Sequence, residues 1–484
     1  MDPANNQIPA TVKSIHLTAV CGTAMGALAV MLKALGYRVT GSDQNTYPPM
    51  STFLAEKGIT LSMGFDAAHL AHHPDLVIVG NAITRDNPEA VYLNQAGLNY
   101  CSMPQAVNHF ITRDTKVLLV TGTHGKTTTA SMLAWALYHL GFDPSFLIGG
   151  ILKNFNSNFR LGRGPYTVLE GDEYDTAFFD KGPKFLHYDA AVTILTGIEF
   201  DHADIYRDLA HVKSAFEQKM ARLASDSTLI AFDADVNVDA VIPKNRANIE
   251  RYGQKPGSFW QSRNETIKGY GMQFDLVQDD QSVGRFFAPL PGRHNLDNTL
   301  AAIAAVASLG IDICRINPAL TLFKGIKRRQ EIRGVAAGIT VVDDFAHHPT
   351  AVTATITSLK PHAQNRLLTV FEPRTHSSMR KVFQEAYARA FDMADLVLIR
   401  KPSALEKVPP DERMSAERLV AQLNQRGVAA FYFETTEAII TFVARERREG
   451  DLVLIMSNGG FDNIHQRLIE TLGKTDKTNR QNSG

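Results

Sequence analysis

Val117-Leu-Leu-Val-Thr-Gly-Thr-His-Gly-Lys-Thr-Thr-Thr-Ala130 is the stretch of sequence that best predicts how this chain folds. Its apolar start predicts a buried strand, and the run that begins at Ala130 predicts a helix. The two glycines in between let backbone N–H groups turn toward an anion, and the N-terminus of the helix adds positive potential. Lys126 supplies a mobile positive charge. The stretch is therefore typical of a strand, loop and helix that hold the phosphates of a nucleotide.

The loop is a compact version of the phosphate-binding motif. In the usual G-x-x-x-x-G-K-[ST] spacing a glycine would stand at position 120, where this chain has Val120. The hydroxyl of Thr127 is placed to bind Mg²⁺ next to a phosphate. The alternative is a structural turn that merely contains glycine. For a functional motif we expect phosphate contacts from Gly122, Thr123, His124, Gly125, Lys126, Thr127 and Thr128.

Length and composition favour a multidomain protein of the cytoplasm. The 484 residues suffice for about three domains, each with its own core. Fifty basic residues balance fifty acidic ones, so we expect neither nucleic acid nor an anionic membrane as a partner. We also expect no leader and no membrane span, because no apolar run is long enough. Cys21, Cys101 and Cys314 show neither a metal-binding spacing nor a disulfide pattern, which fits a reducing compartment.

The N-terminal segment predicts a βαβ unit of the kind that binds nucleotides. Ile15–Val20 reads as a strand, Cys21–Gly26 as a turn into a helix that ends at Gly36, and Tyr37–Thr40 as a second strand followed by Asp43. Ala24 replaces the middle glycine of G-x-G-x-x-G and hinders close approach of a pyrophosphate. A nicotinamide cofactor, another nucleotide ligand and a purely structural unit therefore all remain open.

Acidic residues end two further strands of the predicted central unit. Glu170 closes the strand-like run that starts at Tyr166, and Asp172 or Glu173 follows it closely. Oxygen ligands from a strand next to the phosphate loop are what Mg²⁺ requires. His202 ends the second strand, where it is either a surface turn residue or part of the same metal site.

Polar and basic residues surround a later alanine-rich helix. Gly292–Asn298 leads into this helix, and Asn295 either caps it or presents its amide to the edge of a base. Lys324–Gln330 carries four positive charges, as a solvated linker or as a phosphate-facing loop. A third α/β unit begins near Val335, and its strands are each followed by a polar group, namely Asp344, His347, Arg374 and Asn458.

Taken together these motifs resemble those of the Mur ligases, a family of three-domain ATP-dependent enzymes that form amide bonds. The resemblance covers nearly the whole chain and rests on Gly122–Thr128, Glu170, Ile198–His202, Gly292–Asn298, Arg328–Arg329 and Asp343–Pro349. It implies an α/β fold with a Rossmann-like N-terminal domain (1–112) that binds UDP-N-acetylmuramate. A central P-loop ATPase domain (113–325) and a Rossmann-like C-terminal domain (326–484), which binds the acceptor and closes on ATP, would follow.

The same resemblance assigns site residues position by position. ATP would contact the loop Gly122–Thr128 together with His294, Asn295, Asn298, Arg329 and Asp344, and Mg²⁺ would be held by Thr127, Glu170 and His202. The UDP-sugar would meet Gly22, Gly26, Ser42 and Asp43, which displaces the nicotinamide interpretation. The carbamylated lysine of some family members has no counterpart in Ser214–Phe216, and Lys213 and Lys219 are out of register.

Two branches of the family differ in the amine that they ligate. One adds L-alanine, and the other adds the tripeptide L-alanyl-γ-D-glutamyl-meso-diaminopimelate. The segments Thr46–Thr52, Phe178–Tyr188, Asp343–Thr350 and Met456–Phe461 are similar to the tripeptide-adding branch. Donors suited to the carboxylates of a peptide stand at Arg374, Arg380, Ser457 and Asn458, although ordinary surface ion pairs are the alternative for the arginines.

The implied reaction activates the muramoyl carboxylate with ATP as an acyl phosphate, which the acceptor amine then attacks. Lys126 and Arg329, with Mg²⁺, would neutralise the moving phosphoryl group. His347 or His348 would accept the proton of the amine, unless these histidines bind a cation or are structural. A P-loop kinase and an NAD-linked oxidoreductase are the alternatives from other enzyme classes.

Overall fold

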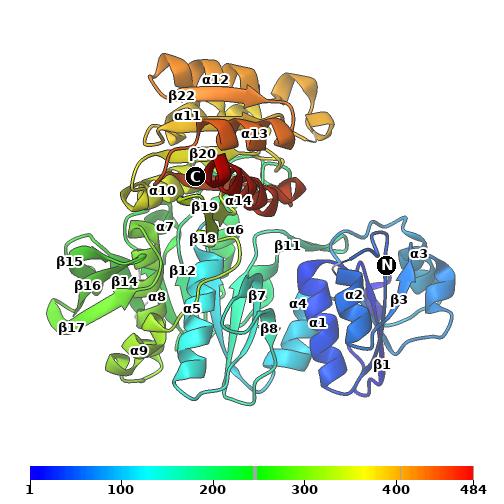
Figure 1. Ribbon diagram of the computed structural model, residues 1–484. Coiled ribbons are helices and arrows are strands. Elements are labelled where there is room, and N and C mark those ends of the chain that lie inside the picture. Colours follow the sequence, from blue (N-terminus) through cyan, green and yellow to red (C-terminus); the bar gives the residue numbers. More distant parts are fainter. Residues whose placement is uncertain (49, 244–247, 404, 483–484) are drawn as a thin grey trace.

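Three β-sheets, each covered by helices, divide the chain into three consecutive blocks (Figure 1). The computed structural model describes residues 1–48, 50–243, 248–403 and 405–482. Pro49, inside the Thr46–Thr52 segment, lies outside the described residues. The C-terminal block sits above the central one, and the N-terminal block lies beside the central one. The predicted three-domain α/β fold is confirmed.

The N-terminal sheet is fully parallel and has the strand order β3-β2-β1-β4-β5. Helix α1 begins after Gly22, and Gly36, with φ of +96°, follows its end as predicted, because this left-handed conformation suits glycine. The elements are β1 (Ser14–Thr18), α1 (Thr23–Ala34), β2 (Arg38–Asp43), α2 (Met50–Glu56), β3 (Thr60–Met63), β4 (Leu76–Val79), α3 (Pro88–Gln95), β5 (Tyr100–Ser102) and α4 (Met103–Val107).

The central sheet has ten strands in the order β17-β16-β15-β14-β13-β12-β6-β9-β7-β8. Its middle is parallel and buried on both faces, whereas β15 to β17 form an antiparallel extension at one edge. The strands are β6 (Lys116–Thr121), β7 (Ser145–Leu152), β8 (Ser157–Arg160), β9 (Tyr166–Gly171), β12 (Val192–Leu195), β13 (Thr228–Phe232), β14 (Ile249–Gly253), β15 (Trp260–Lys268), β16 (Gly271–Gln278) and β17 (Gln281–Ala288).

Helices and a small hairpin complete the central block. The hairpin, β10 (Asp175–Ala177) and β11 (Asp180–Pro183), extends toward the N-terminal block, where Phe179 packs 4.8 Å from Tyr100, ring centre to ring centre. The helices are α5 (Lys126–His139), α6 (Leu209–Ala221), α7 (Val236–Val241), α8 (Arg293–Ser308) and α9 (Ile316–Thr321). None of the described helices of the chain is long and apolar enough to cross a bilayer.

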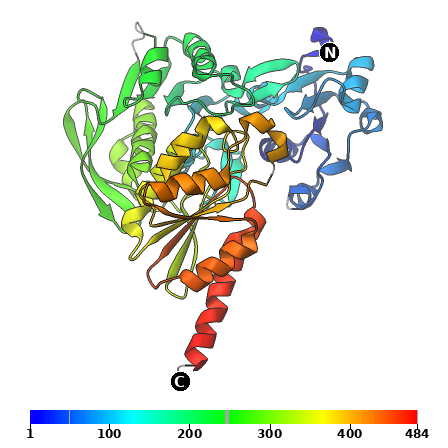
Figure 2. The same ribbon diagram turned by 90° about the horizontal axis from the view of Figure 1, so that it is seen from above.

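The C-terminal sheet has the order β18-β19-β23-β20-β21-β22 and is parallel except for β18. Helices α10 to α12 cover one face and α13 and α14 the other, each over its own apolar core (Figure 2). The elements are β18 (Glu331–Ala336), β19 (Ile339–Asp344), α10 (Pro349–Leu359), β20 (Leu367–Phe371), α11 (Gln384–Ala390), β21 (Leu396–Arg400), α12 (Ala416–Gln425), β22 (Ala429–Phe433), α13 (Thr436–Glu446), β23 (Leu452–Met456) and α14 (Ile464–Asn482).

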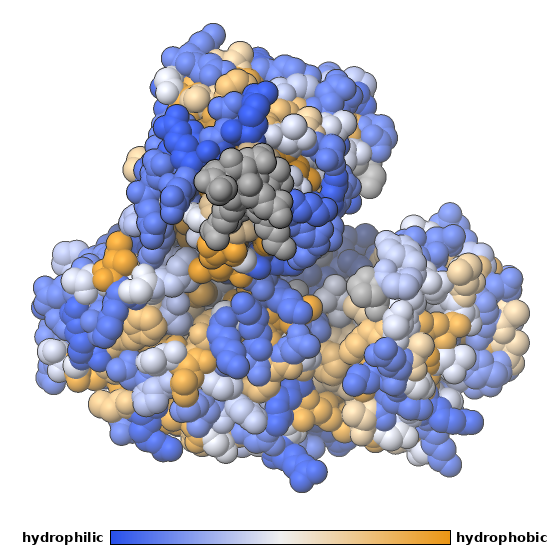
Figure 3. All heavy atoms as spheres, viewed as in Figure 1, coloured by the Kyte–Doolittle hydropathy of each residue, from blue (hydrophilic) through white to orange (hydrophobic). Residues whose placement is uncertain are grey.

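The carboxyl ends of the parallel strands determine where the site lies. In the central sheet Thr121 pairs with Gly171 and Leu195, so the loops after β6, β9 and β12 meet at one edge. In the C-terminal sheet Met456 pairs with Asp344 and Phe371, so the loops after β19, β20 and β23 meet likewise. Ligands of open α/β sheets bind at such edges. The C-terminal block lies above the central one, and the surface is hollowed between it and the N-terminal block (Figure 3).

Candidate active site

The phosphate loop has a backbone that only glycine adopts readily at two positions. Gly122 and Gly125 have φ of +126° and +84°, in the left-handed region. A Cβ at Gly122 would collide with Thr196, and one at Gly125 with Asn298. The loop therefore lies directly against its neighbours, and Lys126 begins helix α5, whose N-terminus faces the cavity.

The Lys126 side chain is held inside the loop by three acceptors. Its Nζ donates to the carbonyl of Gly122 at 2.5 Å, to that of Thr123 at 3.1 Å and to Oε2 of Glu173 at 2.7 Å. Burial alone would lower the pKa of Lys126, but Glu173 and other nearby carboxylates raise it. Lys126 is therefore charged, and its ammonium group is paired with Glu173 in place of a phosphate.

The residues expected to bind Mg²⁺ form two neighbouring pairs. Thr127 Oγ1 donates to Glu170 Oε1 at 2.8 Å, while His202 Nε2 lies 4.0 Å from Oε2 of Glu173. Hydroxyl and carboxylate oxygens match what Mg²⁺ takes, so the donor set fits the ion. Of the two acids expected near Glu170, Glu173, only 2% exposed, lies with this set, whereas Asp172 pairs with Lys184 at 2.9 Å.

Helix α8 lines the end of the cavity where the base of a nucleotide is expected. The helix begins at Arg293 with Gly292 as its N-cap, so of the two roles left open for Asn295 the capping role is wrong. Asn295 Nδ2 donates to Gln330 Oε1 at 2.7 Å, and Asn298 Oδ1 accepts from Thr129 Oγ1 at 3.2 Å. Both amides therefore tie α8 to its surroundings, because each already has a protein partner.

His294 lines the same cavity, in which burial and, to a smaller extent, the charge of His124 lower its pKa to about 4. It is therefore neutral near pH 7 and can both donate and accept one hydrogen bond.

The two arginines of the basic segment before β18 turn inward, whereas its lysines, Lys324 and Lys327, stay exposed. Arg329 Nη2 lies 3.5 Å from Thr127 Oγ1, and its guanidinium is 4.9 Å from the centre of the Phe345 ring. Asp344 accepts from the backbone N–H groups of Gln330 and Ala346, each at 2.7 Å. Burial raises the pKa of Asp344 against the lowering effect of Arg329. The C-terminal block thus places a cation at the phosphate loop.

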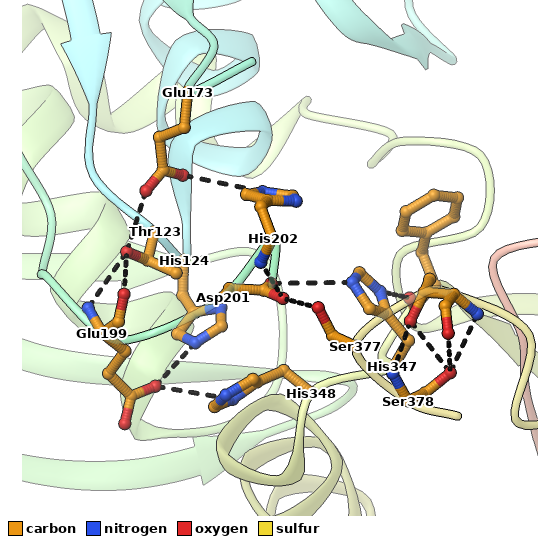
Figure 4. Close-up of polar contacts among 12 residues, drawn as sticks. Thr123, His124, Glu173, Glu199, Asp201, His202, His347, His348, Ser377 and Ser378 are labelled. Carbon is orange, nitrogen blue, oxygen red and sulfur yellow. Dashed lines mark hydrogen bonds and ion pairs between the residues drawn. The ribbon is translucent and has the colours of Figure 1, made fainter. Parts of the chain in front are cut away.

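The loop after β12 is the surface on which the C-terminal block docks (Figure 4). Glu199 binds His124 Nε2 at 2.7 Å and accepts from Thr350 Oγ1 at 2.8 Å. His348 approaches the same carboxylate at 3.6 Å, and burial, with the charge of His124, lowers its pKa to about 4. The ligand atoms of His124, Glu199 and His348 lie within 4.8 Å of one another, a spacing that a divalent metal could bridge.

Asp201 forms the second half of this contact. It accepts from Ser377 Oγ at 2.7 Å and lies 3.7 Å from Nε2 of His347. Burial by itself would raise the pKa of Asp201, but the neighbouring histidines hold it well below its usual range. His347 Nδ1 is 3.1 Å from the carbonyl of Phe345, to which it can only donate, so Nε2 carries a lone pair when the ring is neutral and donates toward Asp201 when the ring is protonated.

A cavity of about 670 Å³ lies between the central and C-terminal blocks and connects these groups. Its walls include the phosphate loop, Glu170, His202, helix α8, Arg329 and Asp344. This volume is in the range of cavities that hold a nucleotide-sized ligand. The cavity thus unites residues that lie more than two hundred positions apart in the sequence.

The four residues expected to bind the UDP-sugar surround the N-terminus of α1. Gly22 is the N-cap of that helix, and Gly26 donates to its carbonyl at 2.8 Å. Asp43 accepts from the backbone of Cys21 at 2.9 Å and so shapes the turn. Ser42 is fully buried and donates to Glu89 at 2.6 Å, which points its hydroxyl into the domain. Binding of a ligand by these residues stays a prediction.

The residues expected to bind a peptide occupy the edge of the C-terminal sheet. Arg374 is exposed, Ser457 donates to Glu372 Oε2 at 2.6 Å, and Asn458 has a buried Oδ1 that accepts no hydrogen bond from the described residues. Arg380 instead pairs with Glu412, the alternative foreseen for these arginines. Their role toward a peptide stays a prediction.

Comparisons with known proteins agree along the whole chain. Three family models match: the Mur ligase family catalytic domain at residues 14–115, the Mur ligase middle domain at 120–306, and the Mur ligase glutamate ligase domain at 328–459. An Escherichia coli K12 protein named UDP-N-acetylmuramate-L-alanyl-γ-D-glutamyl-meso-2,6-diaminoheptandioate ligase is 39% identical over 95% of this chain and 98% of its own.

Two further relatives extend the comparison. A UDP-N-acetylmuramate-L-alanine ligase from Caldanaerobacter subterraneus is 30% identical over 95% of this chain and 97% of its own. The crystal structure of a murein peptide ligase from Psychrobacter arcticus superimposes with a TM-score of 0.69 and 36% identity, covering 95% of this chain and 99% of that one. The chain belongs to the Mur ligase family.

Proposed function

We propose that this protein is an ATP-dependent ligase that joins UDP-N-acetylmuramate to the tripeptide L-alanyl-γ-D-glutamyl-meso-diaminopimelate. The observation that carries the proposal is the cavity in which Lys126 and Thr127 of the phosphate loop face Arg329 from the next domain. The acceptor is inferred from the relatives, because the tripeptide ligase from Escherichia coli is 39% identical and the L-alanine ligase 30% over the same share of the chain. A cytoplasmic location follows from the use of ATP.

ATP would place its phosphates in the loop and its base toward α8. The γ-phosphate would draw Lys126 away from Glu173, replacing one negative partner by another at little electrostatic cost. Arg329 is close enough to Thr127 to contact the same phosphate. Two cations from two domains would then stabilise the charge that builds up as the phosphoryl group moves to the muramoyl carboxylate.

Mg²⁺ fits the oxygen-rich pocket of Thr127, Glu170 and Glu173, with His202 beside it. When bound there, Mg²⁺ would neutralise phosphate charge and help orient the transferred group. The carboxylates of Glu173, Glu170 and Asp172 lie near the single ammonium group of Lys126, and this excess of negative charge favours a divalent cation.

The acceptor amine must lose a proton as it attacks the acyl phosphate. His347 is the proposed base, because its Nε2 carries the lone pair when Nδ1 donates to the carbonyl of Phe345. Asp201 would stabilise the imidazolium that results. The docked loops would keep water from the acyl phosphate, since Glu199 and Asp201 join the two domains on either side of the cavity.

One assay tests the proposal. Purified protein is incubated with ATP, Mg²⁺ and UDP-N-acetylmuramate plus either the tripeptide or L-alanine at equal concentration. ADP release and product mass are then measured. We expect the tripeptide adduct to form with one ADP for each bond. Efficient ligation of alanine with the tripeptide inert would contradict the acceptor, whereas a phosphorylated product without an amide would support the kinase alternative.

A further inference from the structure

Gly459 lies underneath the Arg374 side chain at the edge of the C-terminal sheet. β20 and β23 are neighbouring parallel strands, with Phe371 opposite Met456. The loops that follow them are therefore adjacent, and they carry Arg374 and Gly459. A Cβ placed on Gly459 would stand 2.5 Å from both Cδ and Nε of Arg374 and 2.7 Å from its Cζ. The guanidinium thus rests flat on the bare backbone of this glycine.

The loop beneath Arg374 cannot move to make room. Arg328 donates to the carbonyls of Ser457 at 2.5 Å and Gly459 at 2.7 Å. The Gly459 N–H donates to Ser457 Oγ at 2.9 Å, and that hydroxyl donates in turn to Glu372. The backbone is therefore fixed from both sides. An added methyl group at position 459 would lift the Arg374 side chain, which is 45% exposed and can swing outward.

Arg374 keeps its donors available in this position. Its charged neighbour is Glu372, at 3.7 Å from Nη1, and among the described residues no acceptor takes a hydrogen bond from the guanidinium. The carboxylate of Glu372 is itself engaged by Ser457. A planar guanidinium of this kind recognises a carboxylate with two parallel hydrogen bonds.

The Arg374 loop also adjoins the proposed reaction centre. The Arg374 N–H donates to Ser378 Oγ at 2.9 Å, and Ser377 donates to Asp201 at 2.7 Å. Asp201 directly precedes His202 and accepts its backbone N–H at 2.7 Å. Figure 4 shows Ser377 and Ser378 next to Asp201 and His347. A carboxylate bound by Arg374 would therefore belong to a molecule whose amine lies near the acyl phosphate.

We propose that Gly459 is a positioning residue for acceptor recognition: its missing side chain lets Arg374 lie flat and present its donors to a carboxylate of the peptide. The inference rests on the proposed function. An acceptor with several carboxylates gains a contact far from its amine, whereas alanine has only the carboxylate next to the amine. The Gly459–Arg374 pair thus favours the tripeptide over free alanine.

Gly459→Ala tests this pair without altering charge, and Gly460→Ala is its matched control. The φ of Gly460 is −72°, a conformation that alanine adopts freely, and a Cβ there meets no atom within 4 Å. We expect Gly459→Ala to raise the KM for the tripeptide by about 10- to 100-fold, with the KM for ATP and for UDP-N-acetylmuramate unchanged. Gly460→Ala should match wild type.

The mutations are then repeated in an Arg374→Ala background. If Gly459 acts through Arg374, Gly459→Ala has no further effect on the tripeptide KM there, because the side chain that it displaces is gone. An equal loss in both backgrounds, or an unchanged KM in Gly459→Ala itself, overturns the inference. The wild-type measurement decides the proposed function separately: wild type that ligates alanine and not the tripeptide overturns that function whatever the variants do.

Discussion

Replacing Lys126 with alanine separates what this residue does for catalysis from what it does for folding. Its ammonium group is the one loop cation that a γ-phosphate would meet, and it already donates to the buried Glu173. Loss of one fixed charged donor at a transition state typically costs about 10²- to 10³-fold in kcat. The UDP-sugar binds in another domain in our proposal, so its KM should stay unchanged.

The same substitution leaves Glu173 buried without its partner. Breaking a buried ion pair by removing one member costs about 3–5 kcal/mol, and we expect the lower end because Lys126 is partly exposed. The double variant Lys126→Ala/Glu173→Gln removes the stranded charge, so it should regain most of the stability but none of the turnover. Lys181→Ala serves as control, because the Lys181–Asp175 pair is a surface ion pair worth about 1 kcal/mol or less.

Two measurements decide the outcome. Urea unfolding gives the change in stability, and ADP release at saturating substrates gives kcat. A folded Lys126→Ala protein that keeps more than about a tenth of the wild-type kcat would refute the assignment of the phosphate loop, since the expected loss is at least ten times larger. Equal stability of the single and double variants would contradict the role given to Glu173.

Three further predictions concern metal binding, phosphoryl transfer and the pH dependence of stability. His202→Ala and Glu170→Gln should each raise the Mg²⁺ concentration for half-maximal activity, and metal titrations that overlay wild type would make these residues structural. Arg329→Lys should lower kcat by a larger factor than it raises the KM for the UDP-sugar, because lysine cannot both span the Phe345 ring and reach Thr127. A fall in kcat matched by an equal rise in that KM would exclude a specific role in phosphoryl transfer. Burial lowers the pKa of His16 from 6.5 to about 3. Above pH 6.5 the histidine is neutral in both the folded and the unfolded chain, but as the pH falls toward 3 the unfolded chain takes up a proton that the folded chain does not, and stability is lost. The loss of folding free energy reaches about 2 kcal/mol by pH 5. Wild type should therefore lose more urea resistance between pH 7 and pH 5 than His16→Gln, and parallel losses would contradict burial of a neutral histidine.

Local sequence patterns predicted the parts of the fold whose partners lie nearby in the chain. The strand, loop and helix around Lys126 and the end of α1 near Gly36 depend on a few consecutive residues, and both formed as expected. The antiparallel extension β15 to β17 could not be read in the same way, because its largely polar strands become stable only when the sheet edge is present to pair with them.

The site shows the same difference between features set by neighbouring residues and features that depend on distant ones. The spacing of the phosphate loop predicted that Lys126 and Thr127 face one ligand, because a helix start fixes both. Ser42 illustrates what was missed: the resemblance assigned it to the UDP-sugar site, which stays a prediction, but its hydrogen bond to Glu89, which comes from a helix 47 positions later, was not foreseen. A partner so distant in sequence leaves no trace in the local pattern around Ser42.

One loop both docks the C-terminal domain and forms part of the site. Four consecutive residues make this plain: Glu199 and Asp201 bind Thr350 and Ser377 of the C-terminal domain, Phe200 stacks on Phe383, and His202 points to Glu173 beneath the phosphate loop. Any movement that separates the domains must therefore pull on the loop that carries His202. Since Arg329 and His347 also arrive with the C-terminal domain, an open enzyme has neither the second phosphate cation nor the proposed base. In the proposed mechanism, activation of the carboxylate would therefore be confined to the state in which the loop that carries Arg374 is already in place.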